Sequence, residues 1–128
     1  NAQPADIMRN LVKMYELARA AQITPVPVTV PSVRVDVAGA GPDAAAWIDQ
    51  HLERRLELNG LIAEYAETKG LVWIDLFTAT AEDGTRQLSV PYSNDGLHLT
   101  TAGYRLLARL LYDQLFAKLF VPKPGLNL

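Results

Sequence analysis

The chain has 128 residues, 49% of them hydrophobic and 20% charged, which is typical of one folded domain with a sizeable core and not of a disordered chain. The formal net charge is −2 and the sequence contains no basic stripe that could neutralise phosphates, which disfavours a nucleic-acid partner. The absence of cysteine excludes disulfides and thiolate metal sites and suits either redox compartment.

No apolar run approaches the roughly 18 residues of a membrane span, and no signal-peptide pattern is present. The chain starts at Asn1 and not at Met, so we expect a processed or partial chain. Its localisation stays undetermined, with secretion open.

The first half of the chain predicts a helix, a buried strand and a longer helix. Residues 4–21 begin with a proline suited to a first helical turn and carry apolar side chains at helical spacing (Ile7, Leu11, Met14 and Ala18, widened by Met8, Val12 and Tyr15). Residues 23–30 are β-branched and apolar, although Pro25 and Pro27 remove hydrogen-bond donors. Residues 43–69 form the second helix, with Asp43 as N-cap, an inward face (Ile48, Leu52, Leu56, Ile62 and Ala66) and His51 as a solvated surface residue.

The second half predicts a strand over 71–77, a polar loop over 78–94 and a last helix. Thr100 or Thr101 can cap this helix, which runs to about Phe120 and is apolar around most of its circumference. Residues 121–128 form a terminal extension for which we expect no structure.

The resulting order, α-β-α-β-α, predicts an α/β fold in which a parallel sheet carries helices on both faces. A two-stranded parallel sheet is not a stable core and cannot cover three helices this apolar. We therefore expect an incomplete portion of a larger sheet.

An aspartate and one of the two histidines stand three residues apart just before the last helix, on the loop Asp95-Gly96-Leu97-His98. An aspartate that holds a histidine in one tautomer is part of the apparatus for nucleophilic catalysis. The loop follows a predicted strand, and ligands of such folds sit outside the carboxyl ends of the strands. The same spacing also suits an Asx turn that merely solvates a loop.

The run Asn-Asp-Gly-Leu-His-Leu-Thr-Thr-Ala-Gly-Tyr at 94–104 resembles the last conserved block of the SGNH (GDSL-type) esterases and lipases. The strand at 72–77, and the first helix with the strand that ends at Ser32, resemble the segments that precede this block in the family. The resemblance implies the three-layer α/β/α, flavodoxin-like SGNH architecture, with residues 1–120 as the carboxyl-terminal portion of a single domain.

By this resemblance His98 is the general base and Asp95 its orienting carboxylate in a Ser-His-Asp ester hydrolase that needs no cofactor or metal. The family's nucleophile lies in a Gly-Asp-Ser motif, which this chain lacks. Asn1 is a candidate for the family's oxyanion asparagine. None of Ser32, Ser89 and Ser93 stands on a strand-to-helix elbow, and we expect Ser32 to cap a loop and Ser93 to stabilise a turn.

Three functions remain open. The first is the carboxyl-terminal part of a serine esterase that acts on an ester of unspecified acyl and alcohol groups. Its nucleophile and oxyanion donors then come from a missing amino-terminal part, supplied by a second chain or a self-associated copy. The second is a non-catalytic half-domain that binds a partner through an open sheet edge. The third, a hydrolytic metal site built from Asp75, Asp95 and His98, has little support from spacing.

Overall fold

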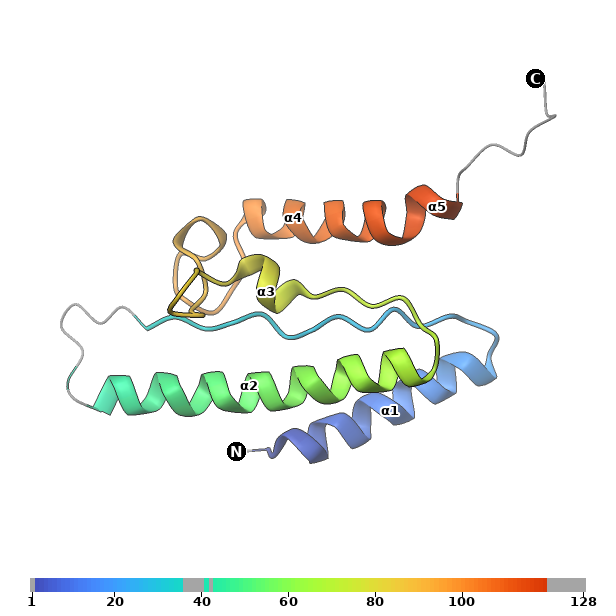
Figure 1. The fold of residues 1–128 in the computed structure, drawn as a ribbon, viewed down its shortest axis with the longest axis horizontal. Coiled ribbons are helices and arrows are strands. Elements are labelled where there is room, and N and C mark those ends of the chain that lie inside the picture. The colour runs from blue at the N-terminus through green and yellow to red at the C-terminus, as the bar shows by residue number, and fades with distance from the viewer. Residues whose placement is uncertain (1, 36–40, 42, 120–128) are drawn as a thin grey trace, which may run out of the picture.

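The computed structural model describes residues 2–35, 41 and 43–119. Two helical layers enclose two extended segments, 23–35 and 71–75 (Figure 1). Helices α1 (Pro4–Ala20) and α2 (Asp43–Thr68) form one layer, whereas α4 (Thr101–Leu111), a π-helical turn (Tyr112–Phe116) and α5 (Ala117–Leu119) follow one another in the other layer. Within the described ranges no helix has the length and apolarity required to cross a membrane.

Helix α2 ends close to the predicted residue, and the reason is local. Gly70 adopts a left-handed φ of 64°, which lets its N–H donate to Glu67 O at 3.1 Å while the N–H of Leu71 donates to Ala66 O at 2.8 Å. This pair of bonds is a Schellman cap. It turns the chain back so that the second extended segment meets the first at the parallel bridge between Val28 and Ile74.

The contact between α1 and α2 forms one of two core clusters, built on Met8, Leu58 and Ile62. Met14, which belongs to the apolar stripe predicted for this helix, is 63% exposed. It follows Met8 by six residues, a rotation of about 240° around a helix with 3.6 residues per turn, so it points away from α2. The second cluster joins Ile48 and Leu52 of α2 to Val33 and Phe77.

The two extended segments pair in parallel, but only through one bridge between Val28 and Ile74. The N–H of Thr29 donates to Ile74 O at 3.0 Å, and the N–H of Ile74 donates to Pro27 O at 2.9 Å. Among the described residues the predicted strands 23–30 and 71–77 are therefore not formed as continuous strands. The first contains two prolines that cannot donate, and the second is cut short by a helix that begins at Leu76.

The other edge of the first extended segment is closed in part by a side chain. The Asn59 amide accepts from the N–H of Val30 at 2.7 Å and donates to Val30 O at 2.9 Å. The prediction did not include this buried polar residue of α2. The backbone N–H and carbonyl of Val28 find no hydrogen-bond partner within the described part of the chain.

The polar loop predicted for 78–94 contains ordered structure. Helix α3 (Leu76–Thr80) is capped by Asp75, whose Oδ1 accepts from the N–H of Thr78 at 3.1 Å and from the hydroxyl of Thr29 at 3.2 Å. An antiparallel bridge joins Ala81 to Leu88, and a 3-10 turn, η1 (Val90–Tyr92), leads into the next loop.

The last helical layer is poorly covered. Gly103 is the only buried residue of α4, and several large apolar side chains of this layer are exposed (Tyr104, Tyr112, Phe116 and Leu119). A helix this apolar is expected to bury a face against another element. The described residues do not supply that element.

Candidate active site

The loop that carries the predicted pair is fixed at both ends. The N–H of Thr100 donates to Tyr92 O at 2.9 Å, which brings the two ends of the loop together. Of the two predicted caps, Thr100 is the N-cap of α4: its hydroxyl accepts from the N–H of Gly103 at 3.3 Å and donates to Pro91 O at 2.8 Å. The intervening residues form a short, closed loop at the start of α4.

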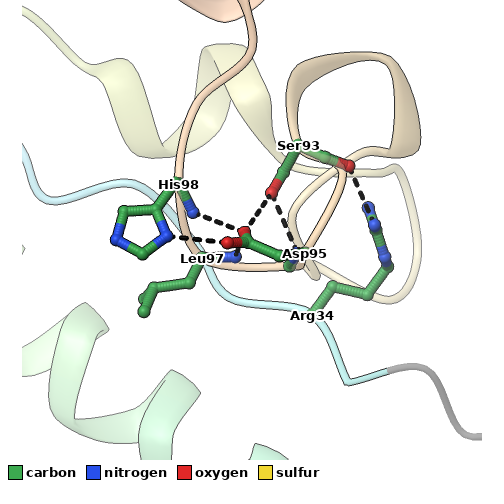
Figure 2. A network of polar contacts seen from close by, with 6 residues as sticks. Arg34, Ser93, Asp95, Leu97 and His98 are labelled. Carbon is green, nitrogen blue, oxygen red and sulfur yellow. Dashed lines mark hydrogen bonds and ion pairs between the residues drawn. The ribbon is translucent and has the colours of Figure 1, made fainter.

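Asp95 and His98 contact one another directly within this loop (Figure 2). Nδ1 of the His98 ring lies 2.7 Å from Oδ2 of Asp95. The other carboxylate oxygen accepts from the backbone N–H of Leu97 at 2.9 Å and of His98 at 2.8 Å. An ionised carboxylate only accepts, so Nδ1 carries the ring proton and Nε2 is left for another partner.

These contacts keep Asp95 ionised. The hydrogen bond from the His98 ring, followed by those from the backbone N–H groups of His98 and Leu97, holds the pKa of the Asp95 carboxyl well below its usual range. The side chains of Asp95 and His98 are 55% and 79% exposed, so a group that lies outside the described residues can reach the His98 ring.

A second set of contacts lies beneath this pair. Ser93 is completely buried; its hydroxyl donates to Asp95 Oδ1 at 3.2 Å and accepts from the N–H of Gly96 at 2.9 Å. The guanidinium of Arg34 donates to Leu88 O and to Ser93 O, each at 2.9 Å. Arg34 could not be predicted from a local pattern, because its partners lie 54 to 62 residues away and belong to no motif that contains it.

None of the three serines presents its hydroxyl to His98. Ser32 is buried and donates its hydroxyl hydrogen to the carbonyl of Arg86, in keeping with a loop-capping role. Ser93 takes part in the turn around Asp95, again as expected. Ser89 is half-buried and its hydroxyl has no hydrogen bond to the pair. Asn1, the candidate oxyanion residue, lies outside the described residues.

The remaining candidates are placed apart from the pair. Asp75 caps α3, and no group of three potential metal ligands forms among the described residues, so Asp75, Asp95 and His98 do not make one site. His51 is not simply solvated as predicted. Its ring stacks on Trp47 with centroids 3.7 Å apart, its Nδ1 lies 2.8 Å from Trp47 O, and it lines a cavity of about 350 Å³ with Arg54 and Arg55.

Comparison with solved structures shows the fold. A GDSL-like lipase from Bacteroides thetaiotaomicron matches with a TM-score of 0.74 and 21% identity, over 91% of this chain and 54% of that one. A protein from Bacteroides fragilis provisionally assigned as an acylhydrolase matches with a TM-score of 0.76 and 24% identity, over 93% of this chain and 54% of that one. The chain thus has the α/β fold of these proteins and spans about half of their length.

The two helical layers and the parallel segments between them correspond to the fold of these two proteins. The model of the GDSL-like Lipase/Acylhydrolase family matches residues 1–106, and the chain belongs to that family. No curated protein matches the chain.

Proposed function

We propose that this chain is the carboxyl-terminal part of a serine ester hydrolase, in which His98 is the general base and Asp95 orients it. The observation that carries the proposal is the 2.7 Å contact between Nδ1 of His98 and Oδ2 of Asp95. It fixes the tautomer whose Nε2 can accept a proton. Family membership supports ester hydrolysis as the reaction class.

In the proposed reaction, Nε2 of His98 takes the proton of a serine hydroxyl as that oxygen attacks the ester carbonyl. The ionised Asp95 stabilises the resulting imidazolium, which donates the proton to the departing alcohol. The serine is then acylated. Water then attacks the acyl group with the same base, releasing the carboxylic acid and restoring the serine. Asn1 remains our candidate for a hydrogen-bond donor to the oxyanion.

We propose that the serine and the other oxyanion donors come from a further part of the domain, outside residues 1–128. A self-associated copy as their source would instead make residues 1–128 active alone. Three features support a source outside these residues. The serines of the chain are engaged elsewhere or have no bond to His98. The exposed apolar side chains around α4 and the unpaired backbone of Val28 are surfaces that another helix and another strand would cover.

The test combines the chain with the polypeptide encoded upstream of Asn1 and follows hydrolysis of p-nitrophenyl acetate. We expect activity from the combination and none above buffer from residues 1–128 alone. His98→Ala should reduce the combined rate by at least about a thousandfold. His51→Ala, which removes the other histidine, is the matched control and should leave the rate nearly unchanged.

An organophosphonate probe supplies a second measurement, because it labels only an activated serine. It should label the added polypeptide in the presence of the chain and lose that labelling with His98→Ala. A normal hydrolysis rate from residues 1–128 alone, abolished by His98→Ala, would contradict the proposed division of the site.

The unpaired edge at Val28 also favours the second candidate, a non-catalytic module that takes up a strand from a partner. It predicts a stable assembly in which the probe labels no serine. Size-exclusion chromatography together with probe labelling separates the two functions.

A further inference from the structure

We propose that Arg34 and Ser93 are positioning residues, which hold the carboxylate of Asp95 so that its hydrogen bond to His98 persists in an exposed loop. This inference rests on the proposed function, because it concerns the same pair. It adds two residues that belong to neither the Asp-x-x-His motif nor the reaction itself.

The pair needs support because it is exposed. The side chains of Asp95 and His98 are 55% and 79% exposed, and an ion pair between side chains this exposed adds little net stability. The backbone N–H groups of Leu97 and His98 hold only Oδ1 of Asp95. The loop backbone itself must be held from outside for these bonds to direct Oδ2 toward the ring.

Ser93 supplies a buried link between the loop backbone and the carboxylate. A hydroxyl has one proton to donate; here it goes to Asp95 Oδ1, while the same oxygen accepts from the N–H of Gly96. Oδ1 thus has three donors, and Oδ2 is left for the His98 ring (Figure 2). Since Ser93 is completely buried, water cannot readily replace its hydroxyl.

Arg34 holds the loop on both sides of Asp95. Its guanidinium donates to Ser93 O at 2.9 Å, two residues before Asp95, and its backbone N–H donates to Gly96 O at 2.8 Å, one residue after it. The second guanidinium nitrogen is fixed by Leu88 O at 2.9 Å. Arg34 forms no ion pair with a described carboxylate. Its planar guanidinium instead holds two backbone carbonyls at a fixed separation.

The test is nuclear magnetic resonance on the whole 128-residue chain, comparing Ser93→Ala and Arg34→Lys with two matched controls. Ser32→Ala removes another buried serine hydroxyl, which is bonded to Arg86 O. Arg55→Lys alters another partly buried arginine, which donates to Pro31 O at 3.1 Å. Neither control residue bonds to the loop at 93–98.

The ring ¹⁵N shifts of His98 report its tautomer, and amide hydrogen exchange reports the bonds from Leu97 and His98 to Asp95. In Ser93→Ala and Arg34→Lys we expect a mixture of tautomers and exchange at these two amides that is about fivefold faster, whereas the controls should match the wild type. Unchanged tautomer and exchange in folded Ser93→Ala would overturn the proposal. Ser93→Ala decides the matter if Arg34→Lys does not fold.

The assembled hydrolase gives an independent measurement. Ser93→Ala should lower kcat about tenfold with KM nearly unchanged, because the residue does not contact substrate. If the spectra change as expected but no combination hydrolyses esters, the proposed function fails and the positioning role stands. If hydrolysis depends on His98 but the spectra of both variants match the wild type, the positioning role fails alone.

Discussion

Replacement of Gly96 by alanine tests the close contact between the Asp95–His98 loop and the extended segment before it. Gly96 has a φ of 81°, and a Cβ added there would lie 2.1 Å from the carbonyl oxygen of Arg34. The left-handed backbone costs a non-glycine residue about 1–2 kcal/mol. Separating the two segments would also strain the packing and break the bond from Arg34 N–H to Gly96 O, for a total loss of about 3–5 kcal/mol.

Gly84→Ala is the matched control, because Gly84 has a φ of 85° and nothing within 4 Å of the added Cβ. It should lose only about 1–2 kcal/mol, the backbone cost alone. In urea unfolding, with a slope of about 2 kcal/mol per molar, the midpoint should fall by about 2 M for Gly96→Ala and by less than about 1 M for Gly84→Ala. Equal shifts for the two variants would refute the close contact and, with it, the account of how this loop is held.

Three further predictions concern stability. Hydrogen bonds hold the pKa of folded Asp95 below its unfolded value, so they stabilise the protein above about pH 4, and this contribution is lost as the pH falls further. In urea unfolding, Asp95→Asn should therefore be less stable than the wild type at pH 7, and the difference should shrink below pH 4. Asn59→Ala leaves the N–H and carbonyl of Val30 without their partners and should lower the free energy of unfolding by about 2 kcal/mol; a loss within about 0.5 kcal/mol would mean that water replaces the amide. Leu58→Ala should cost about 2–4 kcal/mol and Leu17→Ala under about 0.5, since Leu58 is buried against α1 and Leu17 is exposed; similar thermal shifts would contradict the assigned packing.

The helices were predictable because their signals are local. Pro4 at the start of α1 and Thr100 before α4 each act on the backbone within a few residues, and the structure places both at these helix starts. Gly70 acts in the same way at the end of α2. The same holds for the contact between Asp95 and His98, which a single short loop provides.

The strands were predicted less well because strand formation depends on distant partners. The apolar runs around Val28 and Ile74 indicated two strands, yet they form one parallel bridge. Asp75 was expected near the end of a strand but caps α3, a role that the hydroxyl of Thr29 reinforces from 46 residues away. No local pattern distinguishes these outcomes.

The support beneath the candidate site could not be found from the sequence for the same reason. Ser93 looked like an ordinary turn residue, and only its burial and its bond to Asp95 distinguish it. Arg34 lies between the predicted strand 23–30 and the predicted helix 43–69, and its role depends on a fold that brings residues 34 and 93–96 together.

The amide of Asn59 has a consequence for any strand that joins the open edge of the first extended segment. Such a strand can form hydrogen bonds with Val28, but at Val30 it meets backbone groups that Asn59 already occupies. The side chain therefore sets a limit on how far an added strand can extend and in which register it can align, since a shift past Val30 must first displace two hydrogen bonds. In this way one buried asparagine selects among the strands that the exposed edge would otherwise accept without discrimination.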